Sequence, residues 1–573
     1  MNPAIRRRAT PEHAFGDELG PILKRVFAAR GICSDAELDL SLKTLIPSDQ
    51  LSGINEATQL LAEAIATDKR ILIVADFDAD GATSCAVAVR GLRNMGAVTV
   101  DYIVPNRFAY GYGLTPEIVN IALREQPDLI ITVDNGISSM AGVKAARDAG
   151  VDVLITDHHL PGQDIPNANA IVNPNLHDDS FGSKNLAGVG VIFYVLLALR
   201  MELRTRHWFG DNKIKEPNLA ELLDLVALGT VADVVPLDRN NRILVEQGLR
   251  RIRAGKTIAG IAALIEVAGA NQRRLSSSDL AFALGPRLNS AGRLADMGLG
   301  IECLLSDSES KARQLAERLQ QLNLERREIE REMKGQATSF LSSLTIDSGE
   351  LPAGLCFFDA SWHQGVVGIV ASRIKDQCHR PVIAFAPDES GQLKGSGRSI
   401  PGLHLRDLLD LLATRHPNLL SKFGGHAMAA GLSIEAQDFA EFSAIFADLA
   451  AQSVNETMLQ KTLETDGALD DQYLDISLAE KLRTAAPWGQ AFPAPLFDDD
   501  FDIVSRRVVG EYHLKLKLRR AQGQRVVDGI AFNAGQQAWA SDANRIRAVY
   551  RLDVNEYRDA RSVQLLIEHA SEI

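Results

Sequence analysis

Four clusters of acidic and histidine side chains each come directly after an apolar stretch of this chain. Three of these stretches, residues 71–75, 129–133 and 151–156, are rich in Val, Ile and Leu and are predicted to be buried strands of a parallel sheet. Ligands of such sheets bind beyond the carboxyl ends of the strands, so these clusters should converge. The clusters are Asp76 with Asp78 and Asp80, then Asp134, then Asp157 with His158 and His159, and finally Asp233. We interpret them as a metal site.

The side-chain types in these clusters indicate which cation they would bind. Carboxylates and imidazoles without cysteine favour Mn²⁺ or Mg²⁺ over a structural Zn²⁺. Two such ions about 4 Å apart can hold the attacking and leaving oxygens of a phosphoryl transfer. Asp157 is well placed to orient a neighbouring imidazole. Taken singly, each cluster is equally well explained as a turn or a helix cap; all four together favour the metal site.

Two glycine-bearing segments, residues 394–399 and 423–427, could bind an anion. Glycines let backbone amides approach a phosphate, and Ser396 and Arg398 could bind its oxygens. Tight turns between strands are the alternative. Further basic or histidine-bearing segments suggest the same chemistry, although each alone is as well explained by a surface turn with solvated side chains. Their candidate residues are Arg107, Arg287, Asn289, Arg293, His363, Arg373 and His426.

Composition limits the class of protein. The net charge of −13 argues weakly against a nucleic-acid partner, but residues 506–525 are basic, with Lys515 and Lys517 among them and Glu511 as the only acid. Five cysteines without a Cys-x-x-Cys pair argue against a disulfide framework. The absence of a signal peptide and of a membrane-spanning apolar run predicts a cytoplasmic protein with no membrane contact.

Periodicity predicts several domains in the 573 residues. Strands and helices alternate in a doubly wound α/β pattern, a charged helix with a narrow apolar stripe follows, and a second α/β unit precedes a small β-barrel. A coiled-coil dimer is the alternative use of that stripe, and a monomer is favoured. The predicted divisions are 1–65 (helical), 66–300 (α/β), 301–345 (long helix), 346–455 (second α/β) and 465–573 (barrel).

The motifs Asp-Phe-Asp-Ala-Asp-Gly, Val-Asp-Asn-Gly, Asp-His-His and Gly-Thr-Val-Ala-Asp, in this order, resemble those of the DHH phosphoesterase superfamily. Gly-Ser-Gly-Arg-Ser and Phe-Gly-Gly-His resemble its DHHA1-type substrate domain. Together with the long helix and the barrel, they make the whole chain similar to the bacterial single-strand-specific exonucleases of that superfamily. The resemblance implies a DHH parallel-sheet lobe and a DHHA1 lobe joined by a long helix, followed by an OB-type (oligonucleotide-binding) barrel.

The resemblance also implies roles for individual residues. Two Mn²⁺ or Mg²⁺ ions would be held by Asp78, Asp80, Asp134, His158 and Asp233. His159 would lie beside them, with Asp76 and Asp157 as further ligands or as residues that orient the ligands. The expected contacts to the 5′ phosphate and the strand backbone are Ser396, Arg398, Arg107, Arg287, Asn289, Arg293, His363, Arg373 and His426. Lys515 and Lys517 would guide the strand along the barrel.

The activity implied by the resemblance is 5′→3′ hydrolysis of single-stranded DNA by two metal ions, releasing 5′ mononucleotides in DNA repair, mismatch repair and recombination. A single-strand-binding protein and a recombination helicase are the expected partners. One alternative is a DHH oligoribonucleotide or cyclic-dinucleotide phosphodiesterase, for which the long helix and barrel would be superfluous. A catalytically inactive DNA-binding scaffold is another, and the full set of acidic residues argues against it.

Overall fold

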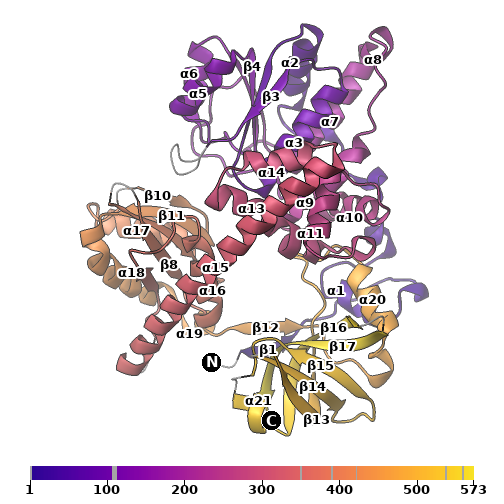
Figure 1. The fold of residues 1–573 in the computed structure, drawn as a ribbon, viewed down its shortest axis with the longest axis vertical. Coiled ribbons are helices and arrows are strands. Elements are labelled where there is room, and N and C mark those ends of the chain that lie inside the picture. Colours follow the sequence, from indigo (N-terminus) through magenta and orange to yellow (C-terminus); the bar gives the residue numbers. More distant parts are fainter. Residues whose placement is uncertain are drawn as a thin grey trace. The chain divides into compact units, whose positions relative to one another are not determined.

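A computed structural model describes residues 3–105, 113–348, 351–388, 391–420, 422–510, 512–535, 538–557 and 560–573 (Figure 1). The chain forms two compact units. Unit 1 comprises residues 1–6 and 323–464, and unit 2 comprises 7–322 and 465–573. A search of the described helices finds none with the length and apolar character needed to cross a bilayer.

The first sheet of unit 2 is parallel, with strand order β3-β2-β4-β5-β6. The strands predicted from the apolar runs are β2 (Ile71–Ala75), β4 (Leu129–Val133) and β5 (Asp152–Thr156). β3 (Val100–Ile103) and β6 (Ala170–Val172) complete the sheet. Because all five strands run the same way, their carboxyl ends meet at one edge.

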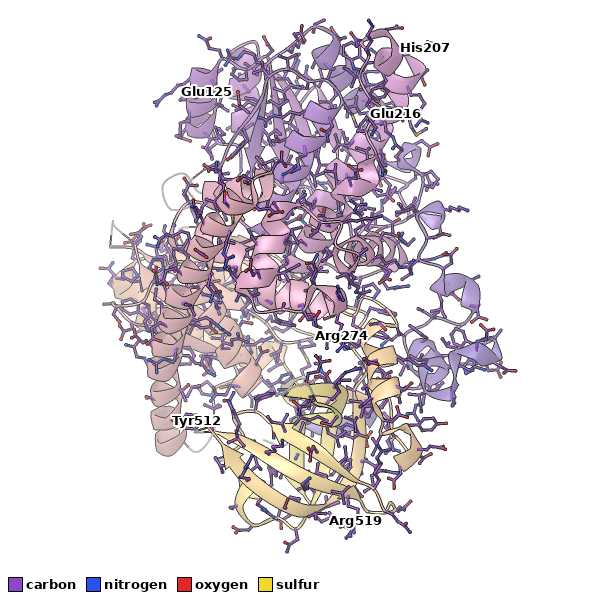
Figure 2. All side chains as sticks on the ribbon, turned by 45° about the vertical axis from the view of Figure 1, so that its right-hand side comes forward. Glu125, His207, Glu216, Arg274, Tyr512 and Arg519 are labelled. Carbon is purple, nitrogen blue, oxygen red and sulfur yellow. The ribbon has the colours of Figure 1, made fainter. Side chains whose placement is uncertain are left out.

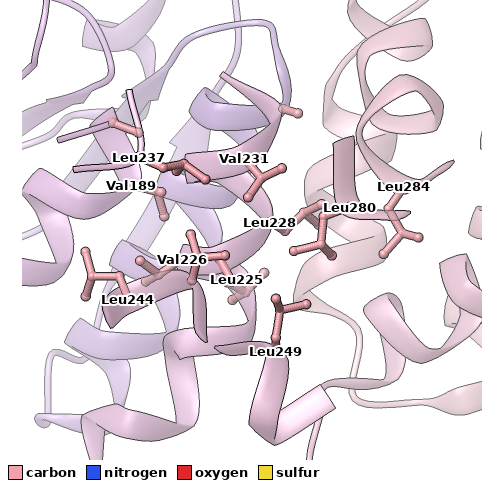
Figure 3. Packing of buried hydrophobic residues seen from close by; sticks show 14 of the residues in the cluster. Val189, Leu225, Val226, Leu228, Val231, Leu237, Leu244, Leu249, Leu280 and Leu284 are labelled. Carbon is pink, nitrogen blue, oxygen red and sulfur yellow. The ribbon is translucent and has the colours of Figure 1, made fainter. Parts of the chain in front are cut away.

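Helices cover both faces of this sheet, as predicted for a doubly wound fold. Alternate strand residues belong to different hydrophobic clusters: Ile73 and Ile131 pack with α2 (Ile54–Ala66), α3 (Ala79–Asn94) and α7 (Gly188–Thr205). On the other face, alternate residues pack with α5 (Pro116–Ala122) and α6 (Met140–Asp148). The apolar helix α9 (Leu223–Ala232) lies in the centre of the larger cluster, against α10 (Arg239–Arg253), as Figure 3 shows.

Residues 285–293, expected to form a basic loop, are helical instead. After α11 (Ala259–Val267), the short α12 (Ser277–Asp279) continues through a π-helix, η8 (Leu280–Leu284), into α13 (Gly285–Leu294). The expectation was wrong because Pro286 is the second residue of α13, in its first turn, where a proline is tolerated. Gly292 permits close packing: a Cβ there would lie 1.8 Å from the Phe77 carbonyl oxygen. Helix α14 (Gly298–Leu305) follows.

The N-terminal region departs in part from the predicted helical segment. It contains α1 (Pro21–Ala28), α2 and several short 3₁₀ helices, but it begins with a strand, β1 (Ala4–Arg7). β1 pairs with β12 (Thr462–Thr465), more than 450 positions later in the chain (the Arg6–Glu464 ion pair alone spans 458). The local sequence does not predict a four-residue strand whose partner is so distant in the chain.

The predicted long helix is α15 (Glu309–Ser348), 40 residues long. It starts later than predicted because α14 ends at Leu305, and it continues from unit 2 into unit 1. Ala312, Ala316 and Leu319 are buried in unit 2, and Met333 and Ala337 in unit 1. The narrow apolar stripe is therefore used within the chain.

Unit 1 contains a mixed sheet in the order β10-β11-β9-β8-β7. Its strands are β7 (Leu355–Phe358), β8 (Val382–Pro387), β9 (Leu393–Arg398), β10 (Lys422–Gly425) and β11 (Ala429–Ile434). Its helices are α16 (Val367–Cys378), α17 (Leu405–Arg415), α18 (Phe439–Ser453) and α19 (Glu456–Leu459).

The first glycine-bearing segment lies in a strand of this sheet, and the second begins in a strand and ends in the turn between β10 and β11. The tight-turn alternative therefore holds only for residues 426 and 427. Gly395 and Gly397 are in β9, and Gly424 is in β10. A Cβ at Gly395 would meet Phe385 at 2.5 Å, and one at Gly397 would meet Leu405 at 2.7 Å. These glycines make room for large neighbours, which is a reason for glycine that local sequence does not reveal.

The C-terminal region of unit 2 is a closed five-stranded barrel, β13-β14-β15-β17-β16, as predicted. Its strands are β13 (Phe497–Val509), β14 (His513–Arg520), β15 (Val526–Ala531), β16 (Arg545–Tyr557) and β17 (Ala560–Glu572). Helices α20 (Ile476–Thr484) and α21 (Ala538–Asp542) flank it. The barrel interior belongs to the same hydrophobic cluster as the parallel sheet, and Trp488, just before the barrel, stacks on Phe27 of α1 at 5.8 Å.

Candidate metal centre

The turn after β2 holds the first two candidate ligands. Asp78 caps helix α3: its Oδ1 accepts hydrogen bonds from the amides of Asp80 at 2.9 Å and Gly81 at 3.0 Å. Asp80 is 1% exposed, and its carboxylate accepts from the amides of Gly188 at 2.6 Å and Val189 at 2.9 Å, at the start of α7. Gly81 is required because a Cβ would lie 2.4 Å from the Asp76 carbonyl oxygen.

Asp134 follows β4 in the left-handed region, with φ of 63°, a strained conformation for a non-glycine residue. The next residue supports this turn, because the Asn135 side-chain amide donates to the carbonyls of Val74 at 3.1 Å and Val133 at 2.9 Å. Helix α7 approaches so closely that a Cβ at Gly188 would lie 2.6 Å from the Asp134 side chain. The backbone therefore holds this carboxylate at the sheet edge.

Asp157 binds the two histidines that follow it after β5 through hydrogen bonds. It is fully buried and accepts from the amide of Ile137 at 2.9 Å, the amide of His158 at 2.7 Å and the Nδ1 of His159 at 2.7 Å. Burial opposes ionisation, yet these contacts with His159 and His158 lower the pKa of Asp157. At His159, burial lowers the pKa, but the hydrogen bond and charge of Asp157, together with the charges of Asp76 and Asp78, outweigh it and raise the pKa to about 9.

His158 connects the two halves of the cluster. Its Nε2 lies 3.1 Å from Asp134 Oδ1 and 3.4 Å from Asp233 Oδ2, where Asp233 caps the end of α9. Three overlapping sets each have ligand atoms within 4.8 Å of one another. They are Asp134 with His158 and His159, Asp80 with His158 and Asp233, and Asp76 with Asp78 and Asp134. All the predicted carboxylates and imidazoles of the four clusters thus lie in or directly beside one site.

Burial and mutual repulsion make this site favourable for cations. Desolvation, and then the neighbouring Asp78, raise the pKa of Asp80 to about 7. Desolvation and nearby carboxylates also raise the pKa of Asp134 and of Asp233 well above the ordinary range. Hard oxygen donors with an imidazole, crowded within 4.8 Å, fit divalent Mn²⁺ or Mg²⁺.

Helix α13 carries three of the predicted residues, and one of them, Asn289, supports the turn after β2. Asn289 Oδ1 accepts the amide of Ala79 at 2.8 Å, so this side chain holds the Asp78–Asp80 turn. Arg287 is 9% exposed and donates to the Ala283 carbonyl in the π-helix. Arg293 is half-buried near the end of the same helix. Arg107 lies outside the described residues.

In unit 1, Ser396 and Arg398 meet the first turn of α16. Arg398 Nη1 lies 3.1 Å from Ser396 Oγ, and a Cβ at Gly368 would be 2.8 Å from that Oγ and 3.0 Å from Arg398 Nη2. Burial lowers the pKa of Arg398. A buried guanidinium, a hydroxyl and a helix N-terminus form an environment favourable to an anion.

The other predicted residues of unit 1 are more dispersed. His363 Nδ1 accepts the amide of Gly365 at 3.0 Å just before α16. Arg373 Nε binds Glu330 Oε1 at 2.8 Å, and Glu330 also pairs with the buried Arg326. His426 is exposed in the turn between β10 and β11.

The basic stretch of the barrel is less isolated than its sequence suggested, because carboxylates come from neighbouring strands. Lys517 pairs with Asp528 at 3.2 Å, Arg519 with Asp502 at 3.2 Å and Arg520 with Asp499 at 2.6 Å. Lys515 lies opposite Arg507, so basic charge remains at that end of the hairpin. Figure 2 labels Tyr512 and Arg519 on this part of the barrel.

Sequence reasoning missed two asparagines that hold the histidine loop. Asn173 Nδ2 donates to the His159 carbonyl at 2.9 Å, and Asn175 Nδ2 donates to the His158 carbonyl at 2.6 Å. The available signal was the apolar stretch Ala170–Val172, which is followed by polar residues as the other strands are.

Family models match three parts of the chain. The DHH family N-terminal domain matches residues 70–230, the DHHA1 domain matches 351–452, and the RecJ OB domain matches 465–569.

Full-length similarity agrees with these matches. The single-stranded-DNA-specific exonuclease RecJ of Dickeya dadantii is 54% identical over 99% of this chain and 98% of its own length. Among solved structures, RecJ from Thermus thermophilus in complex with Mn²⁺ has a TM-score of 0.80 at 30% identity and covers 97% of this chain and 76% of that one. The Mg²⁺ complex from the same organism has a TM-score of 0.74 at 28% identity, covering 97% and 75%. The chain therefore belongs to the RecJ family of DHH-domain proteins.

Proposed function

We propose that this protein is a single-stranded-DNA-specific exonuclease that hydrolyses phosphodiester bonds with two divalent cations, Mn²⁺ or Mg²⁺. It works in the 5′→3′ direction and releases 5′ mononucleotides. The observation that carries this proposal is the convergence of three overlapping carboxylate and imidazole sets, each within 4.8 Å, at one edge of the sheet. The names of its relatives agree with it.

The five assigned ligands are Asp78, Asp80, Asp134, His158 and Asp233, with Asp76 beside them. When bound, the cations would lower the pKa of an attacking water and offset charge on the phosphoryl oxygens. Asp157 orients His159 through Nδ1, which supports a role for the His159 ring at the scissile phosphate. Asn289 and the start of α7 keep the carboxylates in position before any cation arrives.

We assign the 5′→3′ direction of digestion to a 5′ phosphate site in unit 1. The anion-favouring group of Ser396, Arg398 and the first turn of α16 would hold the 5′ phosphate, with Arg107 as the further predicted contact. We assign contacts along the strand to the remaining predicted residues, Arg287, Arg293, His363, Arg373, His426, Lys515 and Lys517. Because Glu330 already binds Arg373 through Nε, only the rest of that guanidinium would meet the strand.

The test is digestion of a 5′-phosphorylated single strand that carries its label at either end, with Mn²⁺ and with duplex as control. The proposal expects a labelled 5′ mononucleotide as the first product and little digestion of duplex. Release from the 3′ end first would refute the direction. Equal digestion by Asp134→Ala and the parent would refute the metal-centre assignment, and no digestion by the parent would favour an inactive scaffold.

Substrate length distinguishes the proposed exonuclease from the alternative, an oligoribonucleotide or cyclic-dinucleotide phosphodiesterase. Short oligoribonucleotides and cyclic dinucleotides should be poor substrates, and long single strands should compete strongly. Deletion of the barrel would not be informative, because its interior is part of the core of unit 2. The single-strand-binding protein, the recombination helicase, the role in DNA repair and recombination, the cytoplasmic location and the monomeric state remain predictions.

A further inference from the structure

Phe282 is an aromatic side chain of unit 2 that is exposed to 82%. It lies in the π-helix η8, and such single-turn irregularities are frequent at functional sites. Beside it is a cavity of about 340 Å³ with a mainly apolar lining that includes Val234, Trp488 and Pro493. An exposed aromatic ring at the mouth of an apolar cavity suggests a ligand with a flat apolar face.

Two direct structural connections link this cavity to the metal centre. Val234 lines it and immediately follows Asp233; it has φ of 62°, a strained value for a β-branched residue, and is 62% exposed. The second connection is the helical segment from α12 to α13. Phe282 lies in its π-helix, and Asn289 further along caps the turn that carries Asp78 and Asp80.

A second cavity adjoins the first. It has a volume of about 220 Å³ and shares Ser278, Trp488, Ala494 and Arg551 with it. Its lining is also mainly apolar, with Asp279 and Arg483 among its polar residues, and it extends along the barrel strand β16, which carries Arg551.

We propose that Phe282 and this cavity form a base-binding subsite for the single strand. The inference rests on the proposed function and adds a specific contact to it. A base offers a flat π-face for Phe282 whatever the sequence, which suits a sequence-tolerant nuclease. The cavity lies at the lower end of the roughly 300–1,000 Å³ range of small-molecule sites, so a helix of a partner protein would not fit. Continuity with Asp233 makes the strand the natural occupant.

The experiment combines protein variants with strands that lack one base. Single strands with a 5′ phosphate carry an abasic site at successive positions from the 5′ end, and KM and kcat are measured with Mn²⁺. For the parent, KM should rise about tenfold when the abasic site reaches one particular position. Phe282→Ala should raise KM on the intact strand about tenfold, with kcat nearly unchanged, and should lose sensitivity at that position. Phe282→Tyr should restore both.

Met201→Ala is the matched control, because Met201 is also a large exposed apolar residue (57%) of unit 2 and does not line the cavity. It should behave as the parent does. An unchanged KM in Phe282→Ala, or an unchanged abasic profile, would overturn the inference. If the parent hydrolyses no single strand, the proposed function fails instead. The affinity of the same strands for the parent and for Phe282→Ala, measured by fluorescence anisotropy, then still decides the base contact.

Discussion

Two acidic clusters in unit 2 have similar compositions and opposite electrostatics. In the barrel strand β13, Asp498 is fully buried and lies 2.9 Å from Arg7 and 2.6 Å from Arg547, while Asp499 lies 2.6 Å from Arg520. Although burial opposes it, the contacts with Arg7 and Thr465 lower the pKa of Asp498. At the sheet edge, burial and neighbouring carboxylates raise the pKa of Asp80, Asp134 and Asp233.

The difference lies in what holds the carboxylates. Guanidinium groups neutralise the barrel cluster, so those aspartates serve the fold. Backbone amides hold Asp78 and Asp80, and an imidazole lies between Asp134 and Asp233. These contacts hold the carboxylates in position but neutralise little of their negative charge. Bound cations would neutralise the rest. The density of acidic residues in the sequence does not separate the two cases, because Asp498–Asp500 is the more continuous run.

The largest expected contrast is between Asp134→Asn and Asp498→Asn. The first should reduce kcat on single-stranded DNA by about 10³-fold or more, because a ligand is lost. It should also stabilise the metal-free protein, since one buried repulsive charge is removed. Asp498→Asn should leave kcat within about threefold and destabilise the protein by about 1–3 kcal/mol, less than a fully buried pair because both arginines are partly exposed. Mononucleotide release and urea unfolding measure the two effects. A large loss of kcat in Asp498→Asn, with little loss in Asp134→Asn, would contradict the contrast.

The two variants should also differ in how much Mn²⁺ stabilises them against unfolding. Mn²⁺ at about 100 times its Kd should stabilise the parent by about 2.7 kcal/mol for each ion bound, because only the folded state gathers the ligands. Asp498→Asn should be stabilised by Mn²⁺ as much as the parent is. Asp134→Asn should lose most of that stabilisation. Calorimetric unfolding with and without chelator measures this. A parent whose melting temperature ignores Mn²⁺ would speak against a metal centre.

Acid should affect the barrel cluster in a defined direction. The pKa of Asp498 is lower in the folded than in the unfolded protein, so its stabilisation is present above the unfolded value of about 4 and is lost as pH falls through the folded value. Metal-free parent should therefore lose more stability between about pH 5 and 3 than metal-free Asp498→Asn. Parallel curves for the two proteins would mean that Asp498 is not preferentially ionised in the fold.

The smallest expected effect concerns unit 1. Glu330→Gln keeps the shape but removes the charge that holds Arg373 and Arg326, so kcat/KM should fall about threefold to tenfold, mainly through KM. Arg373→Lys, which loses the forked geometry, should give a similar loss, and the double variant should add little. Additive losses would show that the two residues act separately.

The sequence predicted the sheet-edge geometry because it follows from topology alone: parallel strands bring Asp76, Asp134 and Asp157 to one edge. It missed what depends on distant partners. β1 needs β12, the glycines of β9 make room for Phe385 and Leu405, and the barrel arginines meet carboxylates on other strands. Helix α13 was mistaken for a loop because its glycines indicate turns locally, whereas Gly292 serves close packing against Phe77.

The central claim is that the sheet edge, and not the equally acidic barrel strand, binds the cations. Anomalous diffraction from crystals soaked in Mn²⁺ tests it most directly. We expect two peaks within reach of Asp78, Asp80, Asp134, His158 and Asp233, and no peak at Asp498–Asp500. An empty sheet edge, or manganese bound at the barrel strand, would contradict the account.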